Sequence, residues 1–397
     1  MNLNLIFYEL DELSMSVLNS ICDEQDGGVN MSRLINTAIQ NNFSGNLYQN
    51  FLAFIILNNI NPFSLSCERG VELDDTIKQL AMHDCEIFFK LFKISSDKNF
   101  NFNLNNNSLI GAISKTFAAA ASPEELFNLI KNFYETHGVG SFGFYRAFRL
   151  NTYGENFTIE PIINVEDVSL SDITGYELQK RELRLNTEAF IAGRPANNVL
   201  LYGDSGTGKS TSIKALLNDY KNSKLKIIEI YKHQFKYLPD LIARIKGRNY
   251  KFIIFIDDLS FEESETEYKF LKAAIEGGLE VRPNNILIYA TSNRRHIVRE
   301  VWRDRDDMEH SGDIHRSDTL EEKLSLASRF GVAINYSSPS RNEYHEIIKN
   351  LAKKSLGGYK DINELLKGAD AWEIRHGGKS GRAARQYIDY LAGKSMI

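Results

Sequence analysis

This 397-residue chain has few cysteines, no long apolar run and only a small excess of negative charge. Its three cysteines, Cys22, Cys67 and Cys85, show no Cys-x-x-Cys spacing, so neither a disulfide framework nor a structural zinc site is expected. No apolar run approaches the roughly 18 residues of a membrane span, and the acidic start of the chain lacks the basic region of a signal peptide. These absences predict a cytoplasmic protein that does not span a membrane.

The formal net charge of −5 is unevenly distributed. Residues 1–150 hold 10 Lys and Arg against 16 Asp and Glu, whereas residues 151–397 hold 37 against 36. The acidic first part argues against a nucleic-acid-binding arm. The second part is neutral only on average, which leaves room for a local basic groove.

Helical spacing dominates residues 1–150. In "SPEELFNLIKNFY", Ser122 is a capping residue, Pro123 takes the first helical position, and apolar residues from Leu126 to Phe133 recur on one face. We therefore predict a mainly helical N-terminal domain over residues 1–150, with partner binding as its possible role.

Within the predicted core, residues 151–338, the pattern changes from about residue 195 to short apolar runs that alternate with helical segments. Runs that are apolar throughout are typical of strands buried on both faces of a parallel sheet. After Pro339 the spacing is helical only, so residues 339–397 are expected to form a small helical domain. The expected strands are Val199–Tyr202, Lys226–Ile230, Phe252–Ile256, Ile286–Thr291 and Val332–Tyr336.

The stretch "GDSGTGKS", Gly203 to Ser210, matches G-x-x-x-x-G-K-[ST] and lies between an expected strand and an expected helix. This order places backbone N–H groups and the positive end of a helix around a phosphate. Lys209 is expected to reach the β- and γ-phosphates, and the Ser210 hydroxyl to bind Mg²⁺. The candidate nucleotide-binding residues of the loop are Gly203, Asp204, Ser205, Gly206, Thr207, Gly208, Lys209, Ser210 and Thr211.

The stretch "FIIFIDD" ends in two carboxylates at the mouth of the expected sheet. Asp257 is the candidate magnesium residue, with helix capping as the alternative. Asp258 is the candidate that orients or deprotonates the attacking water, although aspartate is shorter than glutamate by one C–C bond, roughly 1.5 Å.

Three polar residues downstream complete a pattern that resembles the AAA+ ATPases. Asn293 ends a strand, Arg329 in "EEKLSLASRFG" precedes the next strand, and Arg382 lies near the start of a helix. The resemblance implies that Asn293 lies beside the γ-phosphate, that Arg329 serves a neighbouring subunit's nucleotide in trans, and that Arg382 or Arg385 contacts the phosphates from a helical lid. The alternatives are a capping role for Asn293, pairing of Arg329 within its own subunit, and a surface position for Arg382.

Upstream, "VSLSDITGYELQK" resembles the AAA+ segment that covers adenine, with Ile173, Gly175 and Tyr176 as candidate contacts. The resemblance thus predicts an α/β fold: a P-loop AAA+ parallel-sheet core over 151–338, a small C-terminal helical lid over 339–397, and the helical N-terminal domain before them.

The motifs are similar to those of an uncharacterised bacterial AAA+ family known as domain of unknown function eight-fifteen, densely over about residues 150–392. Membership implies ATP and Mg²⁺ but little about substrate. The double aspartate followed by "SRF" also resembles replication initiators and helicase loaders, which makes Asp-Asp compatible with hydrolysis.

Three functions remain as hypotheses. The first is an ATPase that works as a homo-oligomer and remodels or regulates a protein partner through residues 1–150. The second is a DNA-associated, loader-like ATPase, favoured by Arg294, Arg295 and His296, although the chain shows no helix-turn-helix or zinc-finger spacing. The third is an ATP-gated scaffold with negligible turnover.

Overall fold

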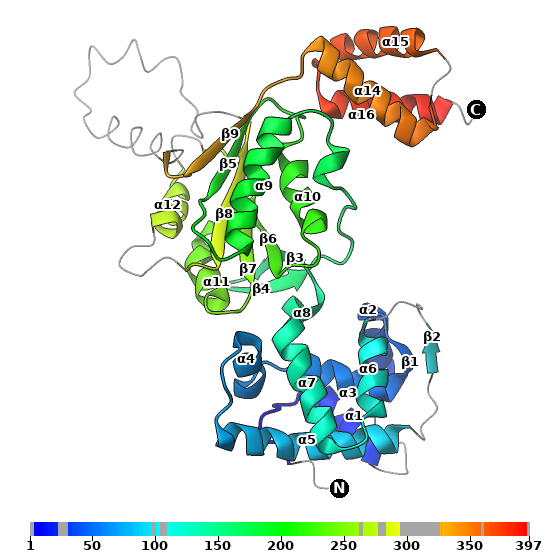
Figure 1. Ribbon diagram of the computed structural model, residues 1–397, viewed down its shortest axis with the longest axis vertical. Coiled ribbons are helices and arrows are strands. Elements are labelled where there is room, and N and C mark those ends of the chain that lie inside the picture. The colour runs from blue at the N-terminus through cyan, green and yellow to red at the C-terminus, as the bar shows by residue number, and fades with distance from the viewer. Residues whose placement is uncertain are drawn as a thin grey trace, which may run out of the picture. The chain divides into compact units, whose positions relative to one another are not determined.

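The computed structural model divides the chain into two compact units, Met1–Tyr145 and Arg146–Ile397 (Figure 1). It describes residues 4–22, 31–96, 101–103, 109–261, 265–276, 283–293, 326, 328–358 and 361–394. Within these ranges no helix is long and apolar enough to cross a membrane.

The N-terminal unit is mainly helical, as predicted. Its helices pack their buried faces into one hydrophobic core that includes Phe51, Phe63, Phe88 and Tyr134. The elements are α1 Glu12–Cys22, α2 Met31–Gln40, β1 Ser44–Asn46, α3 Leu47–Asn58, α4 Pro62–Arg69, α5 Asp75–Ser95, β2 Asn101–Asn103, α6 Leu109–Ala119, α7 Pro123–His137 and α8 Ser141–Phe144. Strands β1 and β2 pair antiparallel.

Helix α7 begins where the sequence predicted. The Ser122 hydroxyl accepts a hydrogen bond from the Glu125 N–H, at 3.2 Å, and Pro123 occupies the first turn.

Cys67 and Cys85 are buried in this unit as thiols, and burial raises the pKa of Cys67 to about 12, so that thiol stays protonated at neutral pH.

A buried carboxylate anchors the start of the described chain to α5. The Asp84 side chain is fully buried, and its two oxygens each accept a backbone hydrogen bond at 2.8 Å, one from Ile6 and one from Phe7. A buried charge is tolerated when hydrogen bonds replace its hydration. Asp84 therefore holds residues 5–10, which bend at Ile6 and Phe7, against the helical core.

We predict that Asp84→Ala lowers the free energy of unfolding by about 1 to 3 kcal/mol, because two partly buried backbone N–H groups lose their acceptor. Urea unfolding of the full chain measures this loss, and hydrogen exchange at Ile6 and Phe7 locates it. Glu86→Ala is the matched control, since Glu86 lies on the same helix but is exposed. Equal destabilisation by the two variants would contradict the assigned role of Asp84.

The second unit is built on a 7-stranded sheet in the order β4-β3-β6-β7-β8-β5-β9. All neighbouring strands are parallel except β3 and β4, which are antiparallel. The strands are β3 Ala147–Tyr153, β4 Asn156–Pro161, β5 Val199–Gly203, β6 Leu225–Ile230, β7 Lys251–Ile256, β8 Ile286–Ser292 and β9 Val332–Tyr336. All five predicted strands are present, and the predicted fold class is confirmed.

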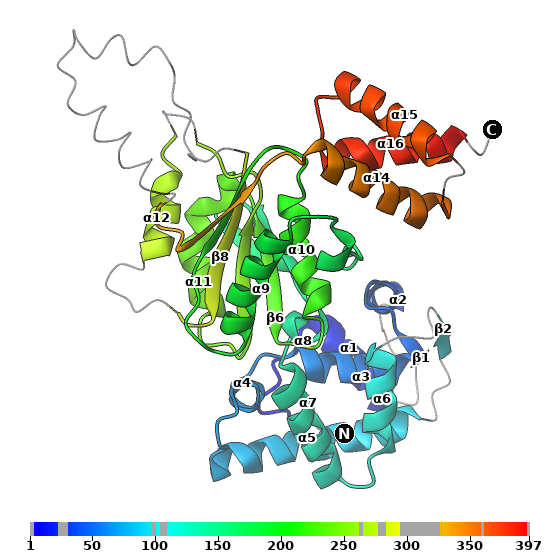
Figure 2. The same cartoon turned by 45° about the horizontal axis from the view of Figure 1, so that its top comes forward.

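Strands β7 and β8 are buried along almost their whole length, which explains their uninterrupted apolar sequences. Helices α9 Glu177–Ile191 and α10 Lys209–Asp219 cover one face of the sheet (Figure 2), where Leu183, Ile213 and Leu216 pack against strand residues such as Val199 and Phe255. The remaining elements of the core are η1 Leu170–Asp172, η2 Lys232–Tyr237, α11 Leu238–Ile245 and α12 Tyr268–Glu276.

The hairpin of β3 and β4 has no counterpart in the predicted strands. Its Tyr153-Gly154-Glu155-Asn156 turn uses Gly154 at φ +61°, and β3 adds to the sheet beside β6. The structure therefore divides the chain after Tyr145, not at residue 150, because residues 147–150 are already sheet.

The lid consists of α14 Arg341–Leu356, α15 Ile362–Arg375 and α16 Gly381–Lys394, which share a small core that includes Tyr344, Ile348 and Ile388. Helix α14 starts with a capping box in which Ser340 and Glu343 bond each other's backbone N–H groups. The short connection from Tyr336 to α14, residues 337–340, is called the linker below.

Candidate nucleotide-binding site

The glycine loop joins the end of β5 to the start of α10. Gly206 and Gly208 adopt positive φ angles of +76° and +95°, which curl the backbone into a cradle before α10 begins at Lys209. At Gly203, with φ +126°, an added Cβ would lie 2.3 Å from the carbonyl oxygen of Tyr336. Only glycine allows β5 to end this close to β9. The Thr207 hydroxyl closes the loop by donating to the Asp204 carbonyl, at 2.8 Å.

Lys209 is held on the inner side of this loop. Its ammonium donates to the carbonyl oxygens of Gly203 and Asp204, at 2.8 and 2.6 Å, and to the Asn293 side-chain oxygen, at 3.1 Å. Burial lowers the pKa of Lys209, while the nearby Asp204, Asp258 and Asp257 oppose that effect. A partly desolvated cation at a helix start fits a phosphate.

The two predicted magnesium residues lie side by side. Strand β7 ends at Ile256 opposite Ala290, so Asp257 emerges at the same edge as Ser210 and Thr291. One Asp257 oxygen accepts a hydrogen bond from the Ser210 hydroxyl, at 2.5 Å, and from the Thr291 hydroxyl, at 2.6 Å. A carboxylate beside a hydroxyl, next to a phosphate cradle, is a donor set that suits Mg²⁺.

Asp258 turns toward Asn293. Its backbone has φ +52°, unusual for a residue with a Cβ, and its N–H donates to the Thr291 hydroxyl, at 2.9 Å. The Asn293 amide donates to the Asp258 carboxylate, at 2.8 Å, while the Asn293 oxygen accepts from Lys209. Asn293 thus links the candidate base to the candidate phosphate-binding lysine.

Thr291 is a site residue that sequence reasoning missed. Its single hydroxyl donates to Asp257 and accepts from the backbone of Asp258, so it orients both acids. The signal was present in "ILIYATSN", because a polar residue near the end of an otherwise apolar strand points to the sheet edge where the acids emerge.

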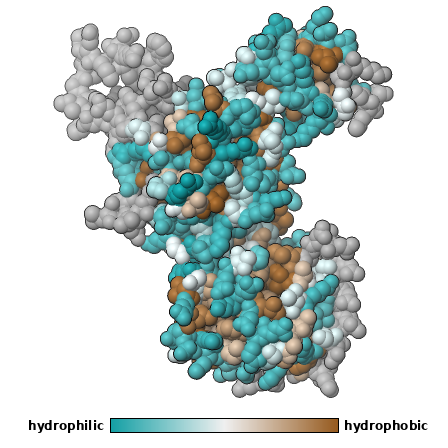
Figure 3. Space-filling view, in the orientation of Figure 1, coloured by the Kyte–Doolittle hydropathy of each residue, from teal (hydrophilic) through white to brown (hydrophobic). Residues whose placement is uncertain are grey.

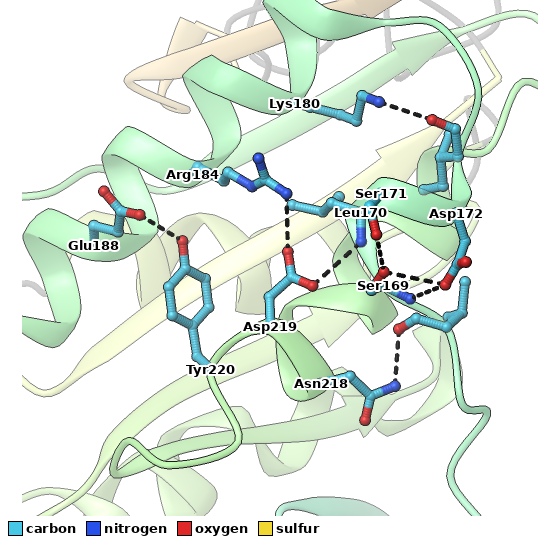
Figure 4. Close-up of polar contacts among 12 residues, drawn as sticks. Ser169, Leu170, Ser171, Asp172, Lys180, Arg184, Glu188, Asn218, Asp219 and Tyr220 are labelled. Atoms are coloured by element: carbon cyan, nitrogen blue, oxygen red, sulfur yellow. Dashed lines mark hydrogen bonds and ion pairs between the residues drawn. The ribbon is translucent and has the colours of Figure 1, made fainter.

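The segment predicted to cover adenine, residues 168–180, is fastened together with the residues just before it to the end of helix α10 (Figure 4). Asn218 donates to the carbonyls of Glu166 and Val168, and Asp219 accepts from the Leu170 N–H and pairs with Arg184. Farther along, Lys180 donates to the Ile173 carbonyl, at 2.7 Å. This segment is therefore fixed to the far end of the same helix, α10, whose first turn carries the P-loop lysine.

The lid reaches the P-loop through the start of α16. The Arg382 N–H donates to the Gly206 carbonyl, at 3.2 Å, and its guanidinium contacts the Ser205 hydroxyl, at 3.4 Å. A Cβ on Gly206 would meet Ser380 and Arg382 at about 3.1 Å, so this glycine also permits the lid to approach. The lid also contacts the segment that was predicted to cover adenine, because Lys354 pairs with Asp172 and the Asn350 amide donates to the Thr174 hydroxyl.

These elements enclose a cleft of about 820 Å³. The predicted residues that line it are Ile173, Tyr176, Ser205, Gly206, Thr207, Gly208, Lys209, Ser210, Thr211, Asp257, Asp258, Asn293, Arg382 and Arg385. Both candidate lid arginines thus face the cleft. Gly203, Asp204, Gly175 and Arg329 do not line it, and Gly175 borders an adjoining hollow beside α14.

Arg329 forms an ion pair with Glu276 of the same chain, at the end of α12. This is the within-subunit pairing that the sequence left open. Arg294, Arg295 and His296, the basis of the DNA hypothesis, lie outside the described residues.

Comparison with known proteins identifies relatives that match part of this chain. Regulatory subunit 6B homologues of the 26S proteasome are 26% identical over 222 residues in Aspergillus niger and 28% identical over 225 residues in Saccharomyces cerevisiae. These matches cover 50% of this chain and 48% of each relative, so the chain spans about half the length of the curated relatives it matches.

Solved structures with similarity include the Thermotoga maritima RuvB Holliday junction branch migration motor, at 18% identity and a TM-score of 0.33, and the FIGL-1 AAA domain in complex with ADP, at 20% identity and a TM-score of 0.39. They cover 56% and 58% of this chain, and 72% and 74% of their own chains.

The family model described as "Protein of unknown function (DUF815)" matches residues 144–395, which is more than half of the chain and includes every residue of the cleft. The chain therefore belongs to this family, an uncharacterised family of AAA+ proteins.

Proposed function

We propose that this protein binds ATP with Mg²⁺ and hydrolyses it to drive conformational change in a homo-oligomer that remodels or regulates a protein partner. The observation that carries this proposal is the convergence of Lys209, Ser210, Asp257, Asp258 and Asn293 from separate elements on one cleft, under a lid that offers Arg382. Each of these side chains has a distinct task in phosphoryl transfer to water.

Lys209 and the backbone of the P-loop bind the phosphates, and Arg382 or Arg385 faces them from the lid. Ser210 and Asp257 would hold Mg²⁺, which offsets negative charge that builds up on the phosphate oxygens. Asp258 accepts a proton from the attacking water or orients it, and Asn293 holds Asp258 in place through its amide. These roles in binding phosphate, Mg²⁺ and water require no further side chain from the described part of the chain.

Oligomerisation is proposed because Arg329 does not line the cleft of its own subunit. Its ion pair with Glu276 keeps it near the surface of the core, with a side chain 24% exposed. In an oligomer, Arg329 would leave Glu276 and approach the nucleotide of the neighbouring subunit.

The N-terminal unit is proposed as the partner-binding part. Its acidic composition disfavours DNA as the ligand of this unit. It also exposes apolar side chains, including Ile39, Ile60 and Val71, and apolar areas are visible on the face shown in Figure 3. Exposed apolar groups on an acidic domain suit a protein partner.

Asp258→Asn is expected to retain ATP binding but to lower the rate of phosphate release by about 100-fold or more, because asparagine cannot accept the proton. Lys209→Ala is expected to lose ATP binding itself. Equilibrium binding of ATP and steady-state phosphate release separate the two effects. Wild-type turnover in Asp258→Asn would show that Asp258 is not the base, and a wild-type protein that releases no phosphate when assembled would support a scaffold instead.

Thr291→Val should raise the Mg²⁺ concentration needed for half-maximal turnover by about 10- to 100-fold, because both acids lose the hydroxyl that orients them. The measurement is a Mg²⁺ titration of ATPase activity at saturating ATP. Thr187→Val is the control, since that buried hydroxyl bonds Leu183 and Tyr289 away from the acids. An unchanged Mg²⁺ requirement in Thr291→Val would remove the proposed orienting role.

Arg329→Ala is expected to lower turnover at least about tenfold, since an arginine that acts in trans neutralises charge in the transition state. Mixing it with Asp258→Asn subunits should restore part of the activity, because each Asp258→Asn subunit supplies an intact Arg329 to a neighbour's intact acids. The double variant Asp258→Asn/Arg329→Ala serves as the control and should restore none. Rescue by neither mixture would argue that Arg329 acts only within its own chain.

A further inference from the structure

The carboxylate of Asp204 points away from the nucleotide cleft although it belongs to the P-loop. Asp204 does not line the cleft, and its Oδ2 atom accepts two hydrogen bonds from Ser338, one from the N–H and one from the hydroxyl, both at 2.7 Å. These bonds lower the pKa of Asp204, so the group is charged at neutral pH. Its own N–H donates to the Tyr336 carbonyl, at 3.0 Å.

Ser338 lies in the linker, the short connection between β9 and the lid helix α14. The next residue along, Pro339, is buried and has a restricted φ, and Ser340 already caps α14. The preceding residue is also held, since the Tyr176 hydroxyl donates to the Ser337 carbonyl, at 2.9 Å. The linker between Ser338 and α14 is therefore short and restricted in its backbone torsions.

The next two P-loop residues contact the lid at a second place. Ser205 and Gly206 bond Arg382 at the start of α16, as described above. Helices α14 and α16 share the lid core through Tyr344, Ile348 and Ile388, so they are packed as one unit. Three consecutive loop residues, 204 to 206, therefore hold the lid both at its linker and at its arginine-bearing helix.

We propose that Asp204 is a positioning residue that couples the P-loop to the lid through Ser338 and thereby sets where Arg382 lies over the phosphates. This inference rests on the proposed ATP hydrolysis. When phosphates enter the loop, movement of residues 204 to 206 reaches α14 and α16 together. Loss of the Asp204 carboxylate releases the linker end, and Arg382 is then held only from one side.

The alternative role for Asp204 is direct contact with nucleotide, which its place in the motif suggests. The two roles predict different kinetics. A positioning residue lowers kcat and leaves the affinity for ATP nearly unchanged, because phosphate contacts of the loop backbone and Lys209 persist. A direct ligand of the ground-state nucleotide raises the dissociation constant instead.

The kinetic test compares Asp204→Ala, Asp204→Asn, Ser338→Ala and the control Ser337→Ala, whose side chain is exposed one residue before Ser338. We expect Asp204→Ala to lower kcat about tenfold with the dissociation constant for MgATP changed by less than about threefold. Asp204→Asn keeps an oxygen acceptor and should recover most of the activity. Ser338→Ala loses one of two bonds and should cause a smaller fall, of about threefold, whereas Ser337→Ala should match the wild type.

A double-mutant cycle identifies the partner. Because Asp204→Ala already removes the bond to the Ser338 hydroxyl, Asp204→Ala/Ser338→Ala should have the same kcat as Asp204→Ala alone. Additive losses would overturn the proposal, as would a wild-type kcat in Asp204→Ala or a tenfold rise in its dissociation constant at unchanged kcat.

Hydrogen exchange of the linker in the nucleotide-free protein makes the test independent of turnover. Asp204→Ala should accelerate exchange at the Ser338 amide at least about tenfold, since that amide loses its acceptor, while Ser337→Ala should not. Unchanged exchange at Ser338 would overturn the coupling. Failure of the ATPase proposal would appear separately, as a wild-type protein that lacks ATP binding or phosphate release.

Discussion

The close approach of β5 and β9 at their carboxyl ends is the constraint on which the rest of the site depends. Gly203 lies so near the Tyr336 carbonyl that no side chain fits, and the Asp204 N–H bonds that same carbonyl. The P-loop starts at one strand end and the linker to the lid starts at the other. Because these two ends are in contact, the P-loop and the lid share one support.

A second shared support lies at the ends of β7 and β8. Thr291 bonds both Asp257 and Asp258, and Asn293 connects Asp258 to Lys209. The result is a continuous polar chain from the candidate magnesium residues to Lys209, the candidate phosphate-binding lysine. Its members come from three different segments, and hydrogen bonds of this kind hold side chains in one arrangement before substrate arrives. Asp258 takes part in this chain with a positive φ, and its carboxylate accepts a hydrogen bond from the Asn293 amide.

The parallel strands could be predicted because strands buried on both faces are apolar throughout, as in β7 and β8. The hairpin of β3 and β4 escaped because one face of each strand is only partly buried, so polar residues such as Arg149, Asn151 and Glu160 interrupt the apolar pattern. Phe148 and Leu150 in β3, and Phe157 and Ile159 in β4, nevertheless alternate with polar residues, and this alternation is a strand signal. For the same reason, the boundary between the two units lies after Tyr145, five residues before the end of the N-terminal domain predicted from the sequence.

For the site, the sequence motifs by themselves predicted that a lysine, a hydroxyl and two acids gather, and the resemblance to AAA+ ATPases added an asparagine and a lid arginine. These are local signals, since each follows a strand or opens a helix, and parallel strands bring such ends to one edge. Only the tertiary structure decided where individual side chains point. Asp204 belongs to the P-loop motif yet bonds the linker, Arg329 pairs with Glu276, and Thr291 orients both acids. These outcomes depend on contacts between residues 33 to 134 positions apart, which no local pattern encodes.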